Sequence, residues 1–271
     1  MCGIAGYIGH EKIINPIIDR TLKLMHNRGP DYKNSFRTQI NNKNVLFLHS
    51  RLSIIDLESR SNQPFFKDNL VIIFNGEIYN YLEIRKNLLN SGYKFSTKSD
   101  TEVIIESYRK YGEDCVKTFE GMWSFVLLDI KKKKIFISRD RFGEKPFYYY
   151  SYKKKFYFGS EPKFIFSLLN KKLNINFSKL SDYLVSGYRS IFKKRSTFYE
   201  GLRELEPAKN LTLDFELNKK EKKYWQLEFR PRNLNEKDIY EESSRLIKRA
   251  MNIRLRSDVP IAFCLSGGID S

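Results

Sequence analysis

The hydrophobic positions of the chain follow two periods, and the period changes along its length. Apolar side chains that recur every three or four residues predict helices, which we expect to begin near residues 15, 82, 100, 161, 178 and 235. Short runs that are nearly continuous, or that alternate with polar residues, predict strands at 3–9, 45–49, 70–74, 123–129, 135–139, 147–152, 156–160 and 211–217. Strands and helices alternate at first, and then several strands follow one another. This order predicts stacked sheets in an α+β fold and argues against a doubly wound parallel sheet.

Capping residues indicate more sharply where three of these helices begin. Asn15 precedes Pro16, a residue preset for the first helical turn, so we expect Asn15 to cap the first helix. We expect Ser178 to cap the helix near residue 180. Asn235, with Asp238 three residues later, approximates a capping box at the start of the last helix.

A change of pattern near residue 215 divides the chain. We expect one large domain over 1–215, a linker that contains a proline over 216–234, and the start of a second domain over 235–271. The second domain is expected to open with the last helix and to continue with a buried strand at 259–265, in which Cys264 belongs to the core. The pattern therefore predicts two units, the second represented only by its first elements.

The composition is that of a globular protein with an excess of lysine. A net charge of +17 raises the hypothesis of nucleic-acid binding. The lysines, however, fall in short runs at 131–134, 153–155 and 219–220, between predicted strands, where a solvated turn is their ordinary place. No recognition helix or stacking platform accompanies them. We therefore expect no nucleic-acid partner, and a weak attraction of anionic substrates stays open.

The apolar segments and the cysteines also indicate a compartment. The sequence has no run of about 18 apolar residues, and its N-terminus lacks a basic region followed by an apolar one. We therefore expect neither a membrane span nor a signal peptide. The three cysteines, Cys2, Cys115 and Cys264, lie far apart and are odd in number, which argues against a disulfide framework. A reducing, cytoplasmic location is the expectation.

The second residue is the first candidate for chemistry. Methionine aminopeptidases remove Met1 when the next side chain is small, and Cys2 is small. The α-amino group thus freed has an unperturbed pKa of roughly 7.7–8.0, so it can take the proton of the thiol on the same residue. Cys2 would then supply both nucleophile and base. The alternative is an ordinary buried cysteine, but Gly3, Gly6 and Gly9 indicate a strand packed closely against another backbone or a ligand.

A second candidate follows the strand predicted at 70–74, which we expect to end there. Asn75 and Gly76 offer a side-chain amide and a backbone N–H side by side, and two such donors suit an oxyanion. An ordinary Asn-Gly turn is the alternative. The motif continues as Glu77-Ile78-Tyr79-Asn80 into the next helix, and this length argues for the functional interpretation.

Three motifs together indicate a family. Cys-Gly-Ile-Ala-Gly at 2–6, Arg-Gly-Pro-Asp at 28–31 and Asn-Gly-Glu-Ile-Tyr-Asn at 75–80 resemble the class II glutamine amidotransferases, in particular the glutamine-hydrolysing asparagine synthetases. The resemblance runs over the whole chain. It implies an N-terminal-nucleophile hydrolase fold, a four-layer sandwich with antiparallel sheets stacked between helices. It also implies that Cys2 attacks the side-chain amide of glutamine, while the 28–31 loop borders the site without a chemical role.

The resemblance assigns further residues to the glutamine site. Arg51 follows a strand, and its planar fork suits the α-carboxylate of glutamine, with a surface ion pair as the alternative. Glu77 and Asp100 are expected to hold the α-ammonium group, with a helix cap as the competing role for Asp100. His49 is expected to be structural. The loop 139–146 is expected to have a structural role near the site, with a place at the domain interface left open. The set expected to bind glutamine is Arg51, Leu52, Ile55, Asn75, Gly76, Glu77 and Asp100, and Cys2, Asn75 and Gly76 are the expected catalytic residues.

The segment 266–271, Ser-Gly-Gly-Ile-Asp-Ser, is the second chemical motif. Its backbone N–H groups and hydroxyls follow a predicted strand, an arrangement that suits phosphates, although a plain glycine turn is the alternative. It resembles the pyrophosphate loop of ATP pyrophosphatases and lacks the Gly-Lys ending of a Walker loop. The resemblance implies ATP and Mg²⁺ as cofactors, with Asp270 as a candidate magnesium ligand. The expected ATP-binding set is Leu265, Ser266, Gly267, Gly268, Asp270 and Ser271.

These motifs predict a glutamine-dependent asparagine synthetase, a carbon–nitrogen ligase. Ammonia would reach a second site, where ATP activates aspartate as aspartyl-AMP, giving asparagine, AMP and pyrophosphate. One helix, one strand and a loop do not complete a nucleotide-binding domain, so we expect the sequence to be the N-terminal part of a longer enzyme. The expected partners are glutamine, aspartate and ATP, and a homodimer is left open.

Two alternatives to this function stay open. An amidotransferase could use another carboxylate acceptor, such as a sugar, peptide or antibiotic precursor, because acceptor contacts would lie beyond Ser271. A non-enzymatic basic protein, binding RNA or acting as a scaffold, is the second alternative. This alternative leaves Cys2, Arg51, Asn75 and Asp100 as coincidences. A glutaminase assay separates it from the asparagine synthetase and from the amidotransferase with another acceptor.

Overall fold

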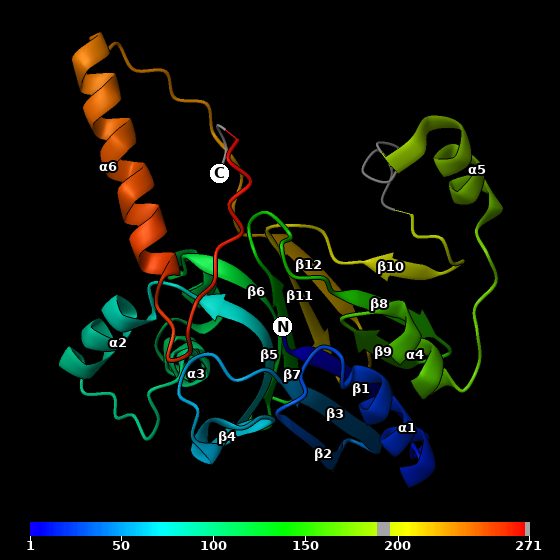
Figure 1. Ribbon diagram of the computed structural model, residues 1–271. Helices are drawn as coiled ribbons and strands as arrows, with labels where there is room; N and C mark the ends of the chain where they lie inside the picture. The colour runs from blue at the N-terminus through cyan, green and yellow to red at the C-terminus, as the bar shows by residue number, and fades with distance from the viewer. Residues whose placement is uncertain (189–195, 269–271) are drawn as a thin grey trace.

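Two six-stranded antiparallel sheets are stacked face to face in the computed structural model, which describes residues 1–188 and 196–268 (Figure 1). Sheet A has the strand order β10-β8-β9-β1-β3-β2. In that order its strands are Leu202–Glu204, Tyr148–Tyr152, Lys155–Gly159, Gly3–Gly9, Lys43–Arg51 and Tyr32–Ile40. Sheet B has the order β12-β11-β7-β6-β5-β4. Its strands are Lys219–Lys223, Lys209–Asp214, Lys134–Arg139, Gly121–Asp129, Leu70–Ile78 and Phe65–Lys67.

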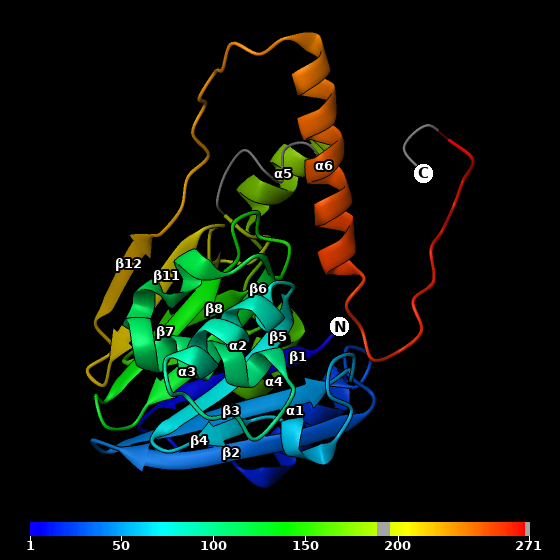
Figure 2. The same cartoon turned by 90° about the vertical axis from the view of Figure 1, so that its left-hand side faces the viewer.

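Helices cover the outer faces of both sheets, which gives four layers (Figures 1 and 2). α2 (Tyr81–Asn90) and α3 (Asp100–Tyr111) pack on sheet B, whereas α1 (Asn15–Met25) and α4 (Pro162–Leu169) pack on sheet A. The two inner layers are antiparallel sheets and the two outer layers are helical. The four-layer α+β sandwich implied by the resemblance is confirmed.

Alternating side chains divide the interior of the sandwich into three hydrophobic clusters. On β5, Phe74 contacts the cluster under α2 and α3, while Ile73 belongs to the cluster between the two sheets. On β1, Ile4 belongs to that middle cluster, and Tyr7 packs toward α1 and α4. Because both faces of these strands are covered, their sequences are apolar without a polar alternation.

β1 is an inner strand of sheet A and positions the N-terminus between the sheets. It pairs with β3 on one side and with β9 on the other. A Cβ atom at Gly6 would overlap the carbonyl oxygen of Leu46 and the ring of Phe158, so only glycine fits there. The expected close approach of a neighbouring backbone to this glycine-rich strand is confirmed at Gly6. The N–H of Ile4 also donates to the Ser160 hydroxyl over 3.1 Å.

β5 continues past the residue at which the sequence predicts its end. Asn75 pairs with Ser124 on β6, and Gly76 pairs with Trp123. A Cβ atom at Gly76 would overlap the carbonyl oxygen of Met122, so glycine keeps the two strands close. The expected strand end at Asn75 is wrong because the ladder to β6 continues through the motif. The candidate donors are therefore held in a sheet and not in a turn.

The helix starts agree with the predicted caps in one case of three. Asn235 accepts a hydrogen bond from the N–H of Asp238 at the start of α6 (Glu236–Arg254), as expected. Asn15, however, is already inside α1, and Ile14 precedes the helix without a side-chain hydrogen bond. Asn176 caps α5 (Phe177–Ser186), so the prediction for Ser178 is wrong. Asn176 lies two residues before Ser178, and asparagine caps a helix as well as serine does.

The apolar pattern does not indicate the four edge strands, β2, β4, β10 and β12, of which β4 and β10 have three residues each. Every residue of β2 is at least partly exposed, and every residue of β12 is exposed. Both lie at the edges of their sheets, where backbone hydrogen bonds to one neighbour hold them. Burial therefore leaves no periodic signal in their sequences. β12 falls inside the segment 216–234 expected as a linker, so sheet B extends into that segment.

The C-terminal segment departs most from expectation. Residues 259–265 form no strand in the structure, and Phe263 and Leu265 are 65% and 75% exposed. Cys264, expected in the core, is exposed as well. These predictions are wrong because a strand needs a hydrogen-bonded neighbour, and none of the described strands lies beside this segment. Of the helix and strand predicted for the second domain, the described residues contain the helix α6 alone.

α6 is a helix of 19 residues that stands away from the sandwich (Figures 1 and 2). Ile253, near its last turn, is buried, whereas Ile239 and Leu246 on the expected apolar face are 50% and 46% exposed. Salt bridges from Arg249 to Glu120 and from Arg256, just past the helix, to Glu83 fix its lower end to the sandwich. No helix of the described residues combines the length and apolar character needed to cross a membrane.

Candidate active site at the N-terminus

A small cavity brings together seven of the residues predicted from sequence. They come from the N-terminus, the end of β3 and the loop after it, the end of β5, and the first turn of α3. The predicted residues that line it are Cys2, Arg51, Leu52, Ile55, Gly76, Glu77 and Asp100. Asn75 is not part of the lining but lies next to Gly76 on β5. Four segments distant in sequence thus meet at the cysteine.

Cys2 is partly buried, and one neighbouring residue holds its thiol. Its Sγ accepts from the N–H of Leu52 at 3.4 Å and lies 3.6 Å from the carbonyl oxygen of Leu52. Burial raises the pKa of the Cys2 thiol to about 11. The thiol is therefore protonated at neutral pH and needs a base close by before it can act as a nucleophile.

Arg28 orients the backbone of Cys2, a role that the sequence does not reveal. Its Nε donates to the carbonyl oxygen of Cys2 over 2.9 Å, and its Nη1 forms an ion pair of 3.1 Å with Glu161. In the same loop, the carboxylate of Asp31 accepts from the N–H of Ser53 at 2.7 Å. The 28–31 loop therefore borders the site, as expected, and fixes both the cysteine and the loop after β3.

The amide of Asn75 is buried without any hydrogen-bond partner. The side chain has no exposed surface, and neither Oδ1 nor Nδ2 has a partner among the described residues. A buried amide left unpaired costs roughly 1–3 kcal/mol. Such a cost is common where a ligand completes the hydrogen bonds, and it marks this position as a site of polar recognition.

Two carboxyl groups, Glu77 and Asp100, face the cavity from different elements. Asp100 is 5% exposed, and its Oδ2 accepts from the N–H of Ile78 over 3.0 Å. Burial raises the pKa of Asp100 to about 6. Burial and the neighbouring Asp100 raise the pKa of Glu77 well above its usual range. Ser99, and not Asp100, is the cap of α3, so the competing role for Asp100 does not hold.

Arg51 lies beside the cavity, but most of its donors are already used. Nη1 donates to the carbonyl oxygen of Glu58 and to the side chain of Asn62 at 3.1 and 2.7 Å. Nη2 donates to the carbonyl oxygens of Ile55 and Asp56. Arg51 thus shapes the loop after β3, and none of these partners carries charge. The salt bridges found among the described residues include none to Arg51, so its charge has no carboxylate partner there.

The cavity is small in this structure. Its volume is about 20 Å³, room for about one water molecule. The wall formed by residues 52–58 is held from the far end of the chain. The N–H of Asp56 donates to the carboxylate of Asp258 over 2.7 Å, and the N–H of Asp258 donates to the carbonyl oxygen of Ile54 over 2.9 Å. A ligand larger than water requires this wall or the N-terminus to move.

His49 has the structural role expected for it. Its side chain is fully buried on β3, and its Nε2 lies 3.1 Å from the carbonyl oxygen of Phe74. Burial lowers the pKa of His49 to about 3, so the ring is neutral at physiological pH. A neutral ring that bonds the β5 backbone ties the two sheets together beside the site.

The predicted ATP-binding residues lie outside this cavity. Leu265, Ser266, Gly267 and Gly268 are exposed in the C-terminal segment, where Gly267 has a φ of +77° and the N–H of Gly268 donates to the Ser266 hydroxyl. Asp270 and Ser271 lie outside the described residues. Among the described residues there is no group of three or more His, Cys, Asp and Glu side chains arranged to hold a metal.

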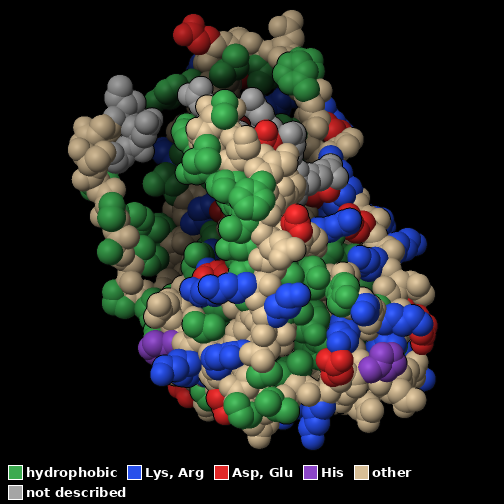
Figure 3. Space-filling view, turned by 90° about the vertical axis from the view of Figure 1, so that its right-hand side faces the viewer, with side chains coloured by type: hydrophobic (Ala, Val, Ile, Leu, Met, Phe, Trp, Pro, Cys, Tyr) green, Lys and Arg blue, Asp and Glu red, His purple; other side chains and the backbone are tan. Residues whose placement is uncertain are grey.

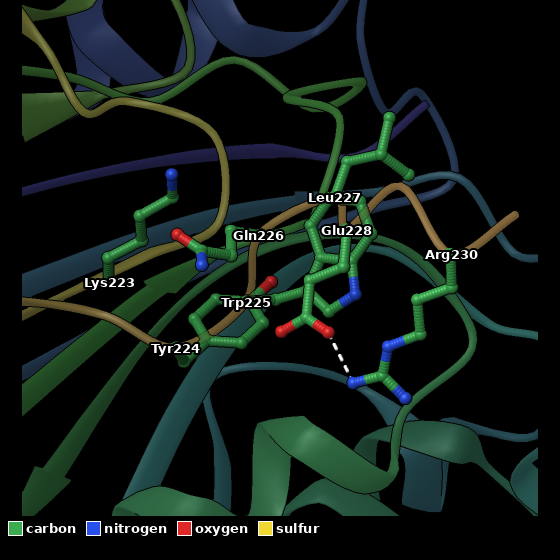
Figure 4. Close-up of a pocket in the computed structure, with 7 residues that line it drawn as sticks. All are labelled: Lys223, Tyr224, Trp225, Gln226, Leu227, Glu228 and Arg230. Carbon is green, nitrogen blue, oxygen red and sulfur yellow. Dashed lines mark hydrogen bonds and ion pairs between the residues drawn. The ribbon is translucent and has the colours of Figure 1, made fainter.

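Two other surfaces carry no comparable arrangement. The hollow in Figure 4 is lined by one continuous stretch after β12, and its ion pair between Glu228 and Arg230 is exposed. On the face shown in Figure 3, lysine and arginine side chains are spread among acidic and apolar ones and do not gather in one groove. Neither surface offers the buried, converging polar groups that line the N-terminal cavity.

Comparison with known proteins agrees with this geometry. Residues 1–225 match a family described as the glutamine amidotransferase domain. The chain belongs to this glutamine amidotransferase family. Residues 242–271 match a second family, described as asparagine synthase. The chain thus joins a glutamine amidotransferase domain to a segment of the asparagine synthase family, as its motifs predict.

Curated relatives of this glutamine amidotransferase carry two kinds of name. The whole chain is 39% identical to a putative glutamine-hydrolysing asparagine synthetase 2 of Methanocaldococcus jannaschii, covering 55% of that protein. It is 34% identical to the glutamine-hydrolysing asparagine synthetase 3 of Bacillus subtilis, covering 44% of it. It is also 31% identical to an amidase, chry2, of Gibberella zeae, covering 42%. The chain spans about half the length of these relatives.

Solved structures show the fold of the amidotransferase independently. The glutamine phosphoribosylpyrophosphate amidotransferase of Bacillus subtilis superimposes with a TM-score of 0.60 at 17% identity. The match covers 83% of this chain and 50% of that one. At this identity the comparison supports the four-layer architecture and nothing finer.

Proposed function

We propose that this glutamine amidotransferase hydrolyses glutamine to glutamate and ammonia, with Cys2 as nucleophile after removal of Met1. The observation that carries the proposal is the unpaired, fully buried amide of Asn75, one residue from the Gly76 that lines the cavity of Cys2. A carbonyl bound by Cys2 develops negative charge on its oxygen. The Nδ2 of Asn75 and the N–H of Gly76 would donate to that oxyanion.

The proton balance of the reaction follows from burial of the thiol. The α-amino group of Cys2 takes the thiol proton, and Sγ attacks the amide carbon of glutamine. The tetrahedral intermediate collapses when the amide nitrogen takes that proton and leaves as ammonia. Water then attacks the thioester, releasing glutamate and restoring the thiol. Because burial raises the pKa of Cys2 to about 11, this base is needed at neutral pH.

Charge in the cavity supports an amino acid as substrate. The half-buried Glu77 and the buried Asp100 present two carboxyl groups to the cavity, which suit the α-ammonium group of glutamine. Arg51 contributes a buried positive charge with neutral partners, which suits the α-carboxylate. When these residues hold the α-ammonium and α-carboxylate groups of glutamine, its side-chain amide is left to face the thiol of Cys2.

We further infer that the protein acts as a glutamine-dependent asparagine synthetase. Support comes from the family match of residues 242–271 and from relatives named asparagine synthetase. ATP would bind through the backbone N–H groups of the turn at Ser266–Gly268, which suits phosphate. The described residues do not provide a magnesium site, so Mg²⁺ at Asp270 stays a prediction from the motif and no step is assigned to it.

A second acceptor class has specific support. The amidase chry2 of Gibberella zeae is 31% identical over the whole chain, close to the identity with named asparagine synthetases. A carboxylate acceptor other than aspartate is therefore the alternative. With the whole protein, ATP and glutamine, formation of AMP that depends on aspartate would support asparagine synthesis, and AMP formation indifferent to aspartate would support the alternative.

Glutamate release from glutamine tests the glutaminase proposal. The wild-type chain should release glutamate, and Cys2→Ala should reduce release to background. The exposed Cys264 lies outside the cavity, so Cys264→Ala is the matched control and should retain activity. Glutamate release by Cys2→Ala at the wild-type rate would contradict the proposal.

A further inference from the structure

Lys145 lies against the N-terminus, although its loop, 139–146, was expected to have only a structural role. The side chain is 4% exposed, and its Nζ lies 2.8 Å from the Sδ of Met1. Met1 itself is 52% exposed. Among the polar contacts found for the Nζ of Lys145 in the described chain, this sulfur is the one partner, and it disappears when Met1 is removed.

The loop that carries Lys145 is rigidly built around Asp140. The carboxylate of Asp140 accepts from the N–H groups of Phe142, Glu144 and Lys145, each at 3.0 Å. Nε of Arg139 donates to the carbonyl oxygen of Lys145 over 2.7 Å. These bonds fix the backbone from which the lysine side chain reaches the N-terminus, so the position of that backbone does not depend on Met1.

Lys145 brings a positive charge to a place where burial disfavours charge. No salt bridge of Lys145 occurs among the described residues, and burial lowers its pKa, while Glu144, Glu77 and Asp140 raise it and Arg28 lowers it. A buried ammonium that lacks a close carboxylate destabilises the fold. Its presence against Met1, the residue before the nucleophile, therefore indicates a role in the reaction.

We propose that Lys145 is a positioning residue that keeps the α-amino group of Cys2 unprotonated, and so ready to accept the thiol proton. The proposal rests on the glutaminase function. The charged groups around the N-terminus are Arg28, Lys145, Glu77 and the Cys2 thiol itself. In the chain that retains Met1, burial, Arg28 and Lys145 lower the pKa of the Met1 amine, whereas Cys2 and Glu77 raise it. Removal of Met1 moves the amine one residue along the chain, to Cys2. Lys145 thus opposes Glu77, whose charge would otherwise hold the proton on the base.

The sign of the effect is fixed by like-charge repulsion. A cation next to an amine disfavours the ammonium form, so the amine loses its proton at a lower pH. Removing the charge of Lys145 therefore moves the acidic limb of the activity profile to higher pH. A nearby unit charge shifts a titration by about one pH unit, so kcat/KM below this limb should fall roughly tenfold. The plateau at high pH should stay close to the wild-type value.

The test compares Lys145→Met with Lys145→Arg over pH 5.5 to 9. Lys145→Met keeps an unbranched apolar stem and loses the charge, whereas Lys145→Arg keeps the charge and should restore the wild-type limb. Lys43→Met is the matched control, since Lys43 is 2% exposed and its Nζ contacts His10, away from the cavity. Circular dichroism of each variant establishes that it is folded. A profile of Lys145→Met that coincides with wild type, or a change in KM alone, would overturn the proposal.

A second measurement separates this inference from the glutaminase proposal. The pH dependence of acetylation of the Cys2 α-amine by acetic anhydride, read by mass spectrometry of the N-terminal peptide, reports the titration of the amine without glutamine. It should shift upward by about one unit in Lys145→Met. If wild type released no glutamate while this shift occurred, the glutaminase proposal would fail and the electrostatic role of Lys145 would stand. An unshifted amine in an active enzyme would overturn the role of Lys145 and leave the glutaminase proposal intact.

Discussion

Nε of Arg28 donates to the backbone carbonyl oxygen of Cys2 over 2.9 Å. This bond fixes the peptide that carries the nucleophile, and lysine has no donor at the same place. We expect Arg28→Lys to lower kcat/KM for glutamine about 10- to 100-fold, because small misplacements of reacting groups are costly. Arg20→Lys on α1 is the control, since Arg20 bonds Ser167 outside the cavity. Equal activities of the two variants would show that Arg28 is dispensable.

Processing of the N-terminus is the second prediction. Because the proposed base is the α-amino group of Cys2, active protein must lack Met1. Met1 is 52% exposed, so its removal requires no unfolding. Intact-mass measurement of active protein should give the mass of a chain that begins at Cys2. Full activity in protein that retains Met1 would refute the proposed base.

Asn75 carries the third prediction. Asn75→Ala removes one of two proposed oxyanion donors, a loss that typically costs about 10²–10³ in turnover. KM for glutamine should change little, because the donor acts on charge that develops during the reaction. Asn210→Ala is a matched control: Asn210 is also buried, and its Oδ1 also lacks a partner, but it lies on β11. Unchanged turnover in Asn75→Ala would make Asn75 a structural residue.

Glutamine binding should depend on pH through the two carboxyl groups. Asp100 has a pKa of about 6, and that of Glu77 is raised well above its usual range, each chiefly by burial. Only the ionised forms attract the α-ammonium group of glutamine. KM should therefore rise as the pH falls through about 6. Steady-state kinetics between pH 5 and 8 tests this, and a KM independent of pH over that interval would contradict it.

Ionisation of Asp100 also has opposite effects on two properties: it favours glutamine binding and lowers the stability of the fold. Its pKa is higher in the folded chain than the ordinary value of 3.8, so the folded state holds the proton more tightly. Stability is then greatest below pH 4 and decreases as the pH rises to about 6. Asp100→Asn removes this charge and should raise the free energy of unfolding at pH 7 by about 1–3 kcal/mol while weakening glutamine binding. Denaturation at pH 7 that shows a large loss of stability would contradict this.

The sequence predicted those strands of the sandwich whose burial leaves a recognisable pattern of apolar residues. Inner strands such as β1 and β5, covered on both faces, were evident as apolar runs, whereas which strands pair with one another was not predicted. The edge strands β2 and β12 left no such trace, because their side chains are exposed. At 259–265 the error was the reverse. An apolar run predicted a buried strand, but a run alone does not supply the neighbouring strand that it needs.

For the site, motifs identified the residues but not what each one contacts. Cys2, Gly76 and Asp100 meet at the cavity as expected. Arg51 lines the cavity as expected, but it also bonds the loop after β3 through backbone carbonyls that no side-chain motif records. The loop 139–146 was expected near the site, but the contact of Lys145 with Met1 was missed because it joins residues 144 positions apart.

The strand β12 carries part of the net positive charge, for which the composition alone indicated no role. Four of its five residues are lysines, and all five are exposed along the open edge of sheet B. An edge strand offers free backbone groups with which another copy of the chain can pair, and lysines repel such a copy. The excess of positive charge thus discourages fibre-like association at the margin of the fold, a protection that concentrated salt would weaken.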